Sequence, residues 1–257
     1  HLAPRPAAAD ADQDRPPLQD MRILVAEHAG IFPEAIRALR REIDVRRAFV
    51  GPRIIEVATA LPGEGGSIIA SNLALHYALT GTRVLLVDGN LRRANLTREL
   101  AVGRRHGFAD AIANGFAPED VILRDTSTGL NFLPAVGPAP TAAAAAEILS
   151  SHATQQALHR LKAQFDVVIV DAPPLLPVID GRILADHADQ IVFVMSWRRT
   201  PKQLARRALS SLGFNQRKLV GVVVNQVDED ILADQHGAFS QMRRPWPSRA
   251  PPGRNAA

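Results

Sequence analysis

The sequence contains no cysteine, and only three of its 30 basic residues are lysine. The lack of cysteine excludes disulfides, thiolate metal sites and a cysteine nucleophile. Apolar runs are only a few residues long, far short of the roughly 18 residues that span a bilayer. No signal peptide is recognisable either, so we expect a cytoplasmic location.

Outside the C-terminus, the chain has no excess of positive over negative residues. The formal net charge is +4, and the last 17 residues carry four arginines and no acid. The remainder of the chain is therefore close to neutral. A charge-neutral body does not indicate a nucleic-acid-binding face, and we expect no nucleic-acid partner.

What is present is enough apolar side chain for one large core: 46% of 257 residues. Residues 1–20 are rich in proline, alanine and aspartate, and we expect a disordered lead-in or linker there. Residues 241–257 are rich in arginine and proline and are expected to be loose as well. We therefore predict one domain over residues 21–240.

Short apolar runs alternate with helical patterns along this domain. Runs without period-two alternation, separated by helices, are typical of a parallel sheet covered on both faces. The sequence thus predicts an α/β, doubly wound fold with ligand chemistry at the carboxyl ends of the strands. The expected strands are Arg53–Ala58, Arg83–Val87, Leu130–Leu133, Asp166–Val170, Gln190–Met195 and Leu219–Val224; the expected helices are Ser67–Leu79 (ending at Gly81), Ala142–Lys162 and one starting near Pro201.

A glycine-rich segment, Leu-Pro-Gly-Glu-Gly-Gly-Ser, ends at Ser67 between the first strand and the following helix. A phosphate-binding P-loop needs such glycines, because backbone N–H groups must wrap the phosphate at the helix N-terminus. It also needs a lysine directly before the serine, where this chain has Gly66, and no lysine precedes Lys162. An ordinary tight turn into a helix is the alternative interpretation.

Four segments in order, ALPGEGGS, VLLVDGNLRR, VDAPPLLPVID and GVVVNQVD, carry a family resemblance over roughly residues 30–228. The chain resembles the cytoplasmic kinase domain of the bacterial tyrosine autokinases, which act with polysaccharide copolymerases in capsule and exopolysaccharide export. The resemblance implies a P-loop NTPase fold related to the Min/Par ATPases, and ATP or ADP with Mg²⁺ as cofactor. It also implies association with the inner membrane through a partner, either a copolymerase membrane protein or a transmembrane half of the same natural chain.

The resemblance further implies roles for individual residues. The nucleotide would be bound by Gly63, Glu64, Gly65, Gly66, Ser67, Ile68 and Asn225, and the metal by Ser67, Asp88 and Asp171. Asp88 and the next position but one, Asn90, would be catalytic, with a carboxylate at Asp88 as the natural base for an acceptor hydroxyl. A capping role is the alternative for Asp88 and for Asp171.

Two of these positions depart from the family pattern. Gly66 removes a cation, and Asn90 replaces a carboxylate by an amide, although phosphoryl transfer depends on positioning and charge neutralisation. We therefore expect weak or absent ATP use, and tighter binding after Gly66→Lys. The family's tyrosine-rich tail is also missing, and the single tyrosine, Tyr77, has a spacing that predicts packing rather than phosphorylation.

One interaction motif is retained. Glu34, Arg37 and Arg40 match the E-x-x-R-x-x-R pattern by which members of the family associate into rings. At this spacing the charges lie near one helix face, where they can meet acids of a neighbouring subunit. We expect self-association through these residues; a solvated face with internal ion pairs is the alternative.

Three hypotheses follow. The leading one is a degenerate, kinase-like regulatory or assembly subunit of an exopolysaccharide export system. The second is an active tyrosine autokinase or ATPase in which Arg92 or Arg93 replaces the lysine. The third is a partitioning ATPase, a class that shares the sheet and the loop.

Overall fold

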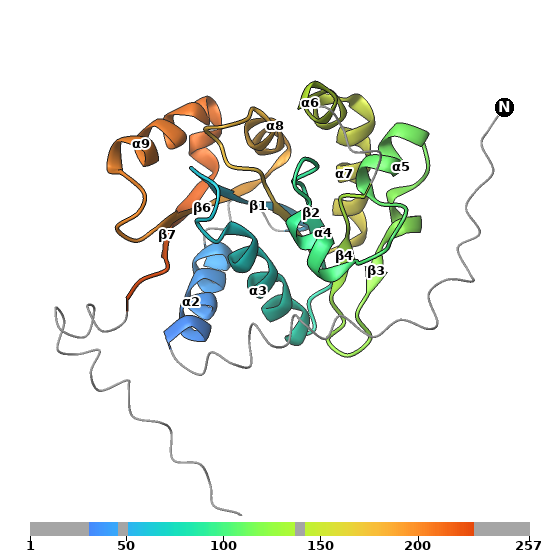
Figure 1. The fold of residues 1–257 in the computed structure, drawn as a ribbon. Helices are drawn as coiled ribbons and strands as arrows, with labels where there is room; N and C mark the ends of the chain where they lie inside the picture. The colour runs from blue at the N-terminus through green and yellow to red at the C-terminus, as the bar shows by residue number, and fades with distance from the viewer. Residues whose placement is uncertain (1–30, 46–50, 137–141, 229–257) are drawn as a thin grey trace, which may run out of the picture.

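The computed structural model describes residues 31–45, 51–136 and 142–228, and these form one seven-stranded sheet with helices on both faces (Figure 1). The strand order is β3-β4-β2-β5-β1-β6-β7, and every neighbouring pair is parallel except the antiparallel β3–β4. This order confirms the predicted doubly wound α/β fold. The strands are β1 (Arg53–Thr59), β2 (Val84–Asp88), β3 (Leu123–Arg124), β4 (Asn131–Leu133), β5 (Val167–Asp171), β6 (Gln190–Ser196) and β7 (Leu219–Asn225).

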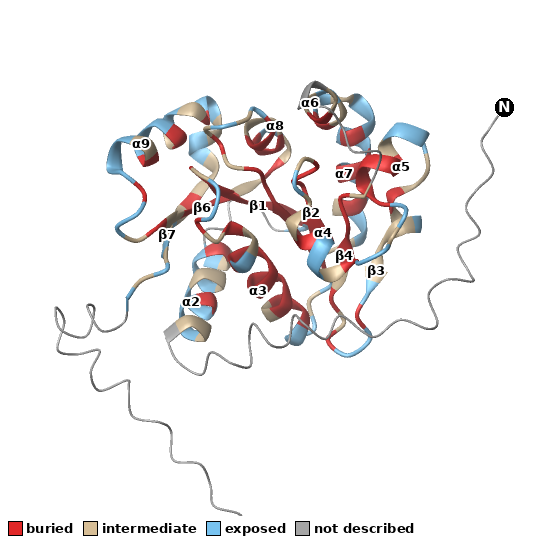
Figure 2. Ribbon diagram, viewed as in Figure 1, coloured by how far each residue is buried: buried red, intermediate tan, exposed pale blue. Residues whose placement is uncertain are grey.

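Two helical layers cover the sheet, and the two hydrophobic clusters of the core lie between each layer and the strands. Successive side chains of a strand point to opposite faces of the sheet, so Ile54 packs in one cluster and Ile55 in the other. Burial on both faces explains why the central strands β1, β2 and β5 are continuously apolar, and Figure 2 shows them in the colour of buried residues, while the edge strands β3 and β7 are more exposed. One layer has α2 (Ile31–Val45), α3 (Gly66–Leu79) and α4 (Asn95–Leu100); the other has α5 (Phe108–Asn114), α6 (Ala142–Ser150), α7 (His152–Gln164), α8 (Asp180–His187) and α9 (Lys202–Ser211), with the 3-10 helices η1 (Pro118–Val121) and η2 (Gly213–Lys218) in the connections.

The prediction of a single helix over Ala142–Lys162 is wrong, because the segment is two helices that meet at Ser151. The Ser151 hydroxyl accepts the backbone N–H of Thr154 at 3.1 Å and donates to the carbonyl of Ile148 at 2.7 Å. Ser151 thereby caps α7 at its start and satisfies a carbonyl near the end of α6. The predicted helix end at Gly81 is confirmed, with Gly81 at φ 81° directly after the C-cap.

The strands end on polar residues at the same edge of the sheet. Asp88 is the last residue of β2 and Asp171 the last of β5, and the two lie opposite each other in the parallel register. Thr59 ends β1, the strand on the other side of β5. The carboxyl ends of the central strands therefore gather at the edge where the glycine-rich segment leaves β1.

A buried carboxyl also lies inside the sheet. Glu56 in β1 is 0% exposed, and neither of its oxygens has a hydrogen-bond partner in the described part of the chain. Burial raises the pKa of Glu56 well above its ordinary value; the Lys218 charge opposes this effect and Asp186 adds to it.

The predicted lead-in 1–20 and tail 241–257 lie outside the described residues. Within the described ranges, no helix has both the length and the apolarity to cross a membrane.

Candidate functional site

The glycine-rich segment forms a loop between β1 and α3 that is held from outside by the end of β7. The Asn225 side-chain amide donates to the carbonyl of Glu64 at 3.0 Å, and the Gln226 amide donates to the carbonyl of Gly63 at 3.0 Å. Gly65 has φ +88°, and a Cβ built there would lie 2.0 Å from Asn225 Nδ2. The clamp therefore requires glycine at this position. Asn225 shapes the loop through this bond, and its role in nucleotide binding stays a prediction.

The Glu64 side chain points into the protein. It is 3% exposed, and its carboxylate accepts the backbone N–H groups of Ala60 at 2.7 Å and Leu61 at 2.8 Å. The Thr200 hydroxyl donates to its other oxygen. Glu64 therefore fixes the curvature of the loop, and only its backbone faces a ligand.

The loop backbone is open for an anion. The N–H groups of residues 63–68 donate no hydrogen bond to any described part of the chain. They lie at the N-terminus of the 14-residue α3, where the helix dipole favours negative charge. The adjoining cleft encloses about 410 Å³ and is lined by the loop, Ile68, Asn90, Arg93, Glu99 and Asp171 among others. This geometry fits the phosphates of a nucleotide.

Ser67 and Asp171 meet on the floor of the cleft. The Ser67 hydroxyl donates to Asp171 Oδ2 at 2.6 Å. Burial, reinforced by the nearby Asp88 charge, raises the pKa of Asp171 to about 8. A hydroxyl and a carboxyl side by side are hard oxygen ligands of the kind that Mg²⁺ accepts, so this pair fits the predicted metal site.

Asp88 is 0% exposed and does not line the cleft. Its carboxylate accepts the N–H of Asn90 at 3.1 Å and both the N–H and the hydroxyl of Thr97, at 2.9 and 2.8 Å. Burial raises the pKa of Asp88. These contacts are those of a residue that caps the following turn, which was the alternative interpretation; its roles as base and metal ligand stay predictions.

The position before Ser67 is crowded for any side chain longer than that of glycine. A Cβ built on Gly66 would lie 2.8 Å from the Thr59 methyl group, and Thr59 is only 5% exposed. The methyl group therefore occupies the space where a lysine side chain would start. Thr59 belongs to no motif, so sequence reasoning missed it; its place at the end of β1 was the only signal.

The turn after β2 separates the two arginines that were candidates to replace the lysine. The Arg92 guanidinium binds the buried Asp180 with two bonds, Nε–Oδ2 at 2.5 Å and Nη2–Oδ1 at 2.7 Å. Arg93 instead is exposed and lines the cleft. Asn90 also lines the cleft, and its side-chain oxygen accepts the backbone N–H of Arg93 at 3.2 Å.

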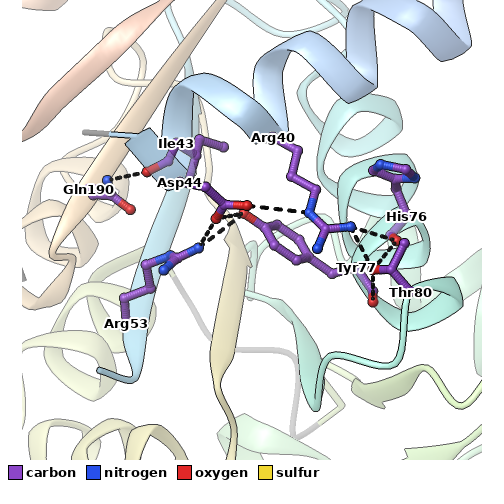
Figure 3. A network of polar contacts seen from close by, with 8 residues as sticks. All are labelled: Arg40, Ile43, Asp44, Arg53, His76, Tyr77, Thr80 and Gln190. Carbon is purple, nitrogen blue, oxygen red and sulfur yellow. Dashed lines mark hydrogen bonds and ion pairs between the residues drawn. The ribbon is translucent and has the colours of Figure 1, made fainter. Parts of the chain in front are cut away.

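Tyr77 packs in the core, as predicted, and is 1% exposed (Figure 3). Its hydroxyl donates to Asp44 at 3.0 Å and accepts from Arg53 Nη2 at 3.2 Å. The Arg40 guanidinium lies 4.4 Å from the ring centroid on the outer side. Burial raises the pKa of Tyr77 to about 12. The residue ties α2 to α3 and β1.

The predicted interface residues all lie on α2 and make internal contacts. Arg37 pairs with the exposed Glu34 one turn earlier. Arg40 donates to the Thr80 hydroxyl at 2.5 Å and pairs with Asp44 at 3.4 Å. These are the internal pairs of the alternative interpretation. Assembly through the outer face of α2 stays a prediction, and Arg40 is the member of the motif with a role inside the subunit.

Comparisons with known proteins agree with this geometry. A family described as an AAA domain matches residues 52–212. The succinoglycan biosynthesis transport protein ExoP of Rhizobium meliloti is 35% identical over 220 residues, which are 85% of this chain and 28% of ExoP. The tyrosine-protein kinase YwqD of Bacillus subtilis is 30% identical over 203 residues, 79% of this chain and 84% of YwqD. The crystal structure of the chimerical protein CapA2B2 superimposes with a TM-score of 0.69 at 26% identity, covering 76% of this chain and 84% of that protein.

Proposed function

Because the chain belongs to the bacterial tyrosine-protein kinases and carries their AAA domain, we propose that it is a kinase-like subunit of exopolysaccharide biosynthesis that acts by binding and assembly. In this proposal it binds a nucleotide weakly and performs little or no phosphoryl transfer. Its relatives support the exopolysaccharide setting, since they include a succinoglycan biosynthesis transport protein.

The observation that carries the proposal is the packing at the phosphate loop. Gly66 supplies no cation, and the Thr59 methyl group fills the space beside it. Phosphoryl transfer depends on neutralising the charge of the outer phosphates, so a loop without its lysine loses much of that capacity. The backbone donors of residues 63–68 remain. The site therefore keeps phosphate binding and lacks a principal element of catalysis.

With nucleotide bound, two different sets of groups in the chain would bind the phosphates and the metal ion. The backbone N–H groups of residues 63–68 would hold phosphate oxygens, and Ser67 and Asp171 would hold Mg²⁺, which supplies charge neutralisation. Asp171 has a pKa of about 8. At neutral pH a cation must therefore displace a proton from this carboxyl, which weakens metal binding.

This sequence also offers a poor acceptor for tyrosine phosphorylation. Tyr77 is the sole tyrosine of the sequence, and its hydroxyl is engaged by Asp44 and Arg53 beneath the surface. Incubation with ATP·Mg²⁺ followed by mass spectrometry is expected to find no phosphotyrosine. Stoichiometric phosphorylation of Tyr77 would contradict the proposal.

The proposed partner is a polysaccharide copolymerase membrane protein, or a transmembrane half of the same natural chain, which would hold the domain at the inner membrane. Supporting this, the chain spans only 28% of ExoP, a transport protein. Self-association through α2 belongs to the same proposal.

The proposal is tested by asking whether exopolysaccharide secretion requires phosphoryl transfer at this site. Secretion of exopolysaccharide is measured in a strain that lacks the gene and is complemented with wild type, Ser67→Ala or Asp171→Asn. We expect both variants to restore secretion as well as wild type. Loss of secretion with either, at equal protein level, would overturn the assembly role and favour the second candidate, an active kinase or ATPase. The Ser67–Asp171 pair, which fits Mg²⁺, is the observation that favours this second candidate.

A further inference from the structure

We propose that Arg93 is the residue that supplies the phosphate-binding cation of this cleft, in place of a lysine in the loop. The ligand class is a di- or triphosphate group, carried by a nucleotide or present as inorganic pyrophosphate. The inference deepens the proposed function and rests on that part of it which assigns a phosphate ligand to the cleft.

Arg93 is placed by a rigid turn. Gly89 at the start of the turn donates its N–H to the carbonyl of Asp171 at 2.9 Å. Asn90 then closes it twice: its side chain accepts the N–H of Arg93 at 3.2 Å, and its carbonyl accepts the N–H of Ala94 at 2.7 Å. Ala94 has φ 46°, a conformation that alanine adopts only when its surroundings impose it. The backbone of Arg93 is thus fixed at the rim of the cleft.

The neighbouring Arg92 and Arg93 have different surroundings. Arg92 is held by the buried carboxylate of Asp180 and anchors the turn to α8. Arg93 lines the cleft and forms no ion pair with any described residue. It is also the one basic residue among those that line the cleft in the described part of the chain. A guanidinium in this place presents paired donors that match phosphate oxygens.

The substitutions elsewhere in the site agree with this role. Glu99 also lines the cleft, and an aspartate in place of Asn90 would add a further carboxylate there that competes with phosphate for the guanidinium. The amide keeps the turn and leaves Arg93 available. At the loop, the Thr59 methyl group crowds the space beside Gly66. The absence of a lysine from the loop and the presence of Arg93 in the same cleft therefore form one consistent arrangement.

The test is a calorimetric titration of the whole chain with ADP and, separately, with inorganic pyrophosphate. The variants are Arg93→Met, which keeps side-chain length without charge, and Arg93→Lys, which keeps the charge. Arg98→Met is the matched control, since Arg98 is an exposed arginine of the adjoining α4 that does not line the cleft. Thermal unfolding of each variant verifies that the fold is unchanged.

We expect Arg93→Met to weaken both ligands about ten- to a hundredfold, the range for losing one charge-assisted bond. Arg93→Lys should retain most of the affinity, and Arg98→Met should stay within about threefold of wild type, because Arg98 is exposed to screening by solvent and ions and does not line the cleft. Added salt should weaken wild type more than Arg93→Met. Equal binding by wild type and Arg93→Met, or an equal loss in Arg98→Met, would overturn the inference while leaving nucleotide binding in place. No binding of either probe by wild type would overturn both, whereas the assembly role is judged separately by secretion.

Discussion

Restoring the missing lysine tests the packing argument most directly, and it needs two substitutions. Gly66→Lys alone sets a Cβ 2.8 Å from the methyl group of Thr59, which is 5% exposed at the end of β1. Forcing an extra carbon into a packed interior costs about 1–3 kcal/mol. Thr59→Ser removes that methyl group and keeps a hydroxyl. The double variant Thr59→Ser/Gly66→Lys therefore accepts the lysine without this strain.

The expected magnitudes separate stability from binding. For a domain of this size, about 1–3 kcal/mol lowers the unfolding midpoint by roughly 2–12 °C, so Gly66→Lys should melt early and the double variant near wild type. A lysine ammonium on the outer phosphates contributes about 1.5–3 kcal/mol, or about ten- to a hundredfold in affinity. The full gain should appear in the double variant.

The measurements are thermal unfolding and calorimetric titration with ATP·Mg²⁺, with Thr59→Ser alone as the control for the lost methyl group. If Gly66→Lys is as stable as wild type and binds as tightly as the double variant, the Thr59 methyl group is no obstacle. If neither lysine variant binds ATP more tightly than its parent, the missing cation is not what limits the site, and the reasoning fails.

Three further predictions follow from other contacts. Burial raises the pKa of Glu56 above its ordinary value of 4.5, so the folded state holds this proton more tightly than the unfolded state does. Its contribution to stability is therefore present below pH 4.5 and is lost as pH rises toward the raised folded pKa; Glu56→Gln should remove that pH dependence in denaturant titrations, and an unchanged slope would contradict it. Arg92→Ala should destabilise by about 3–5 kcal/mol, because the buried Asp180 loses its partner; unfolding in urea measures this, and a loss under about 1 kcal/mol would argue against the ion pair. Replacing Arg37 and Arg40 by alanine should abolish self-association or docking on the membrane partner in sedimentation, with thermal unfolding measured alongside because Arg40 also contacts Thr80 and Asp44 inside the subunit. Arg37→Ala alone should leave stability unchanged because Arg37 is exposed; identical sedimentation of wild type and the double variant would show that the outer face of α2 is only a solvated surface.

The fold could be predicted from local patterns, because a strand buried on both faces is continuously apolar wherever it occurs in a sequence. The glycine loop was predictable for the same reason: its glycines are a local requirement. Pairing of Arg92 with Asp180 was not, since the two residues lie 88 positions apart and meet only when the turn after β2 packs on α8. Nor was the inward orientation of Glu64, which depends on Thr200 from a different strand connection.

The break at Ser151 is a different case. The sequence does contain a local indication of the break, because two adjacent serines interrupt an alanine-rich stretch. Helix-forming residues on both sides of them favoured a single continuous helix instead. A serine whose hydroxyl can accept a backbone N–H indicates the start of a helix as clearly as a periodic pattern of apolar residues indicates its body. The composition of this segment correctly predicted helical structure, but it did not predict that the first helix ends at Ser150.

The residues matched by the AAA domain family, 52–212, are not a unit that can be cut out. Trimming to those limits removes α2, so the ring of Tyr77 would meet water and its hydroxyl would lose Asp44. The same cut removes β7, and with it the Asn225 amide that holds the carbonyl of Glu64 at 3.0 Å. A fragment that keeps both sets of contacts therefore extends beyond the matched limits at both ends, because α2 covers Tyr77 and the end of β7 holds the phosphate loop.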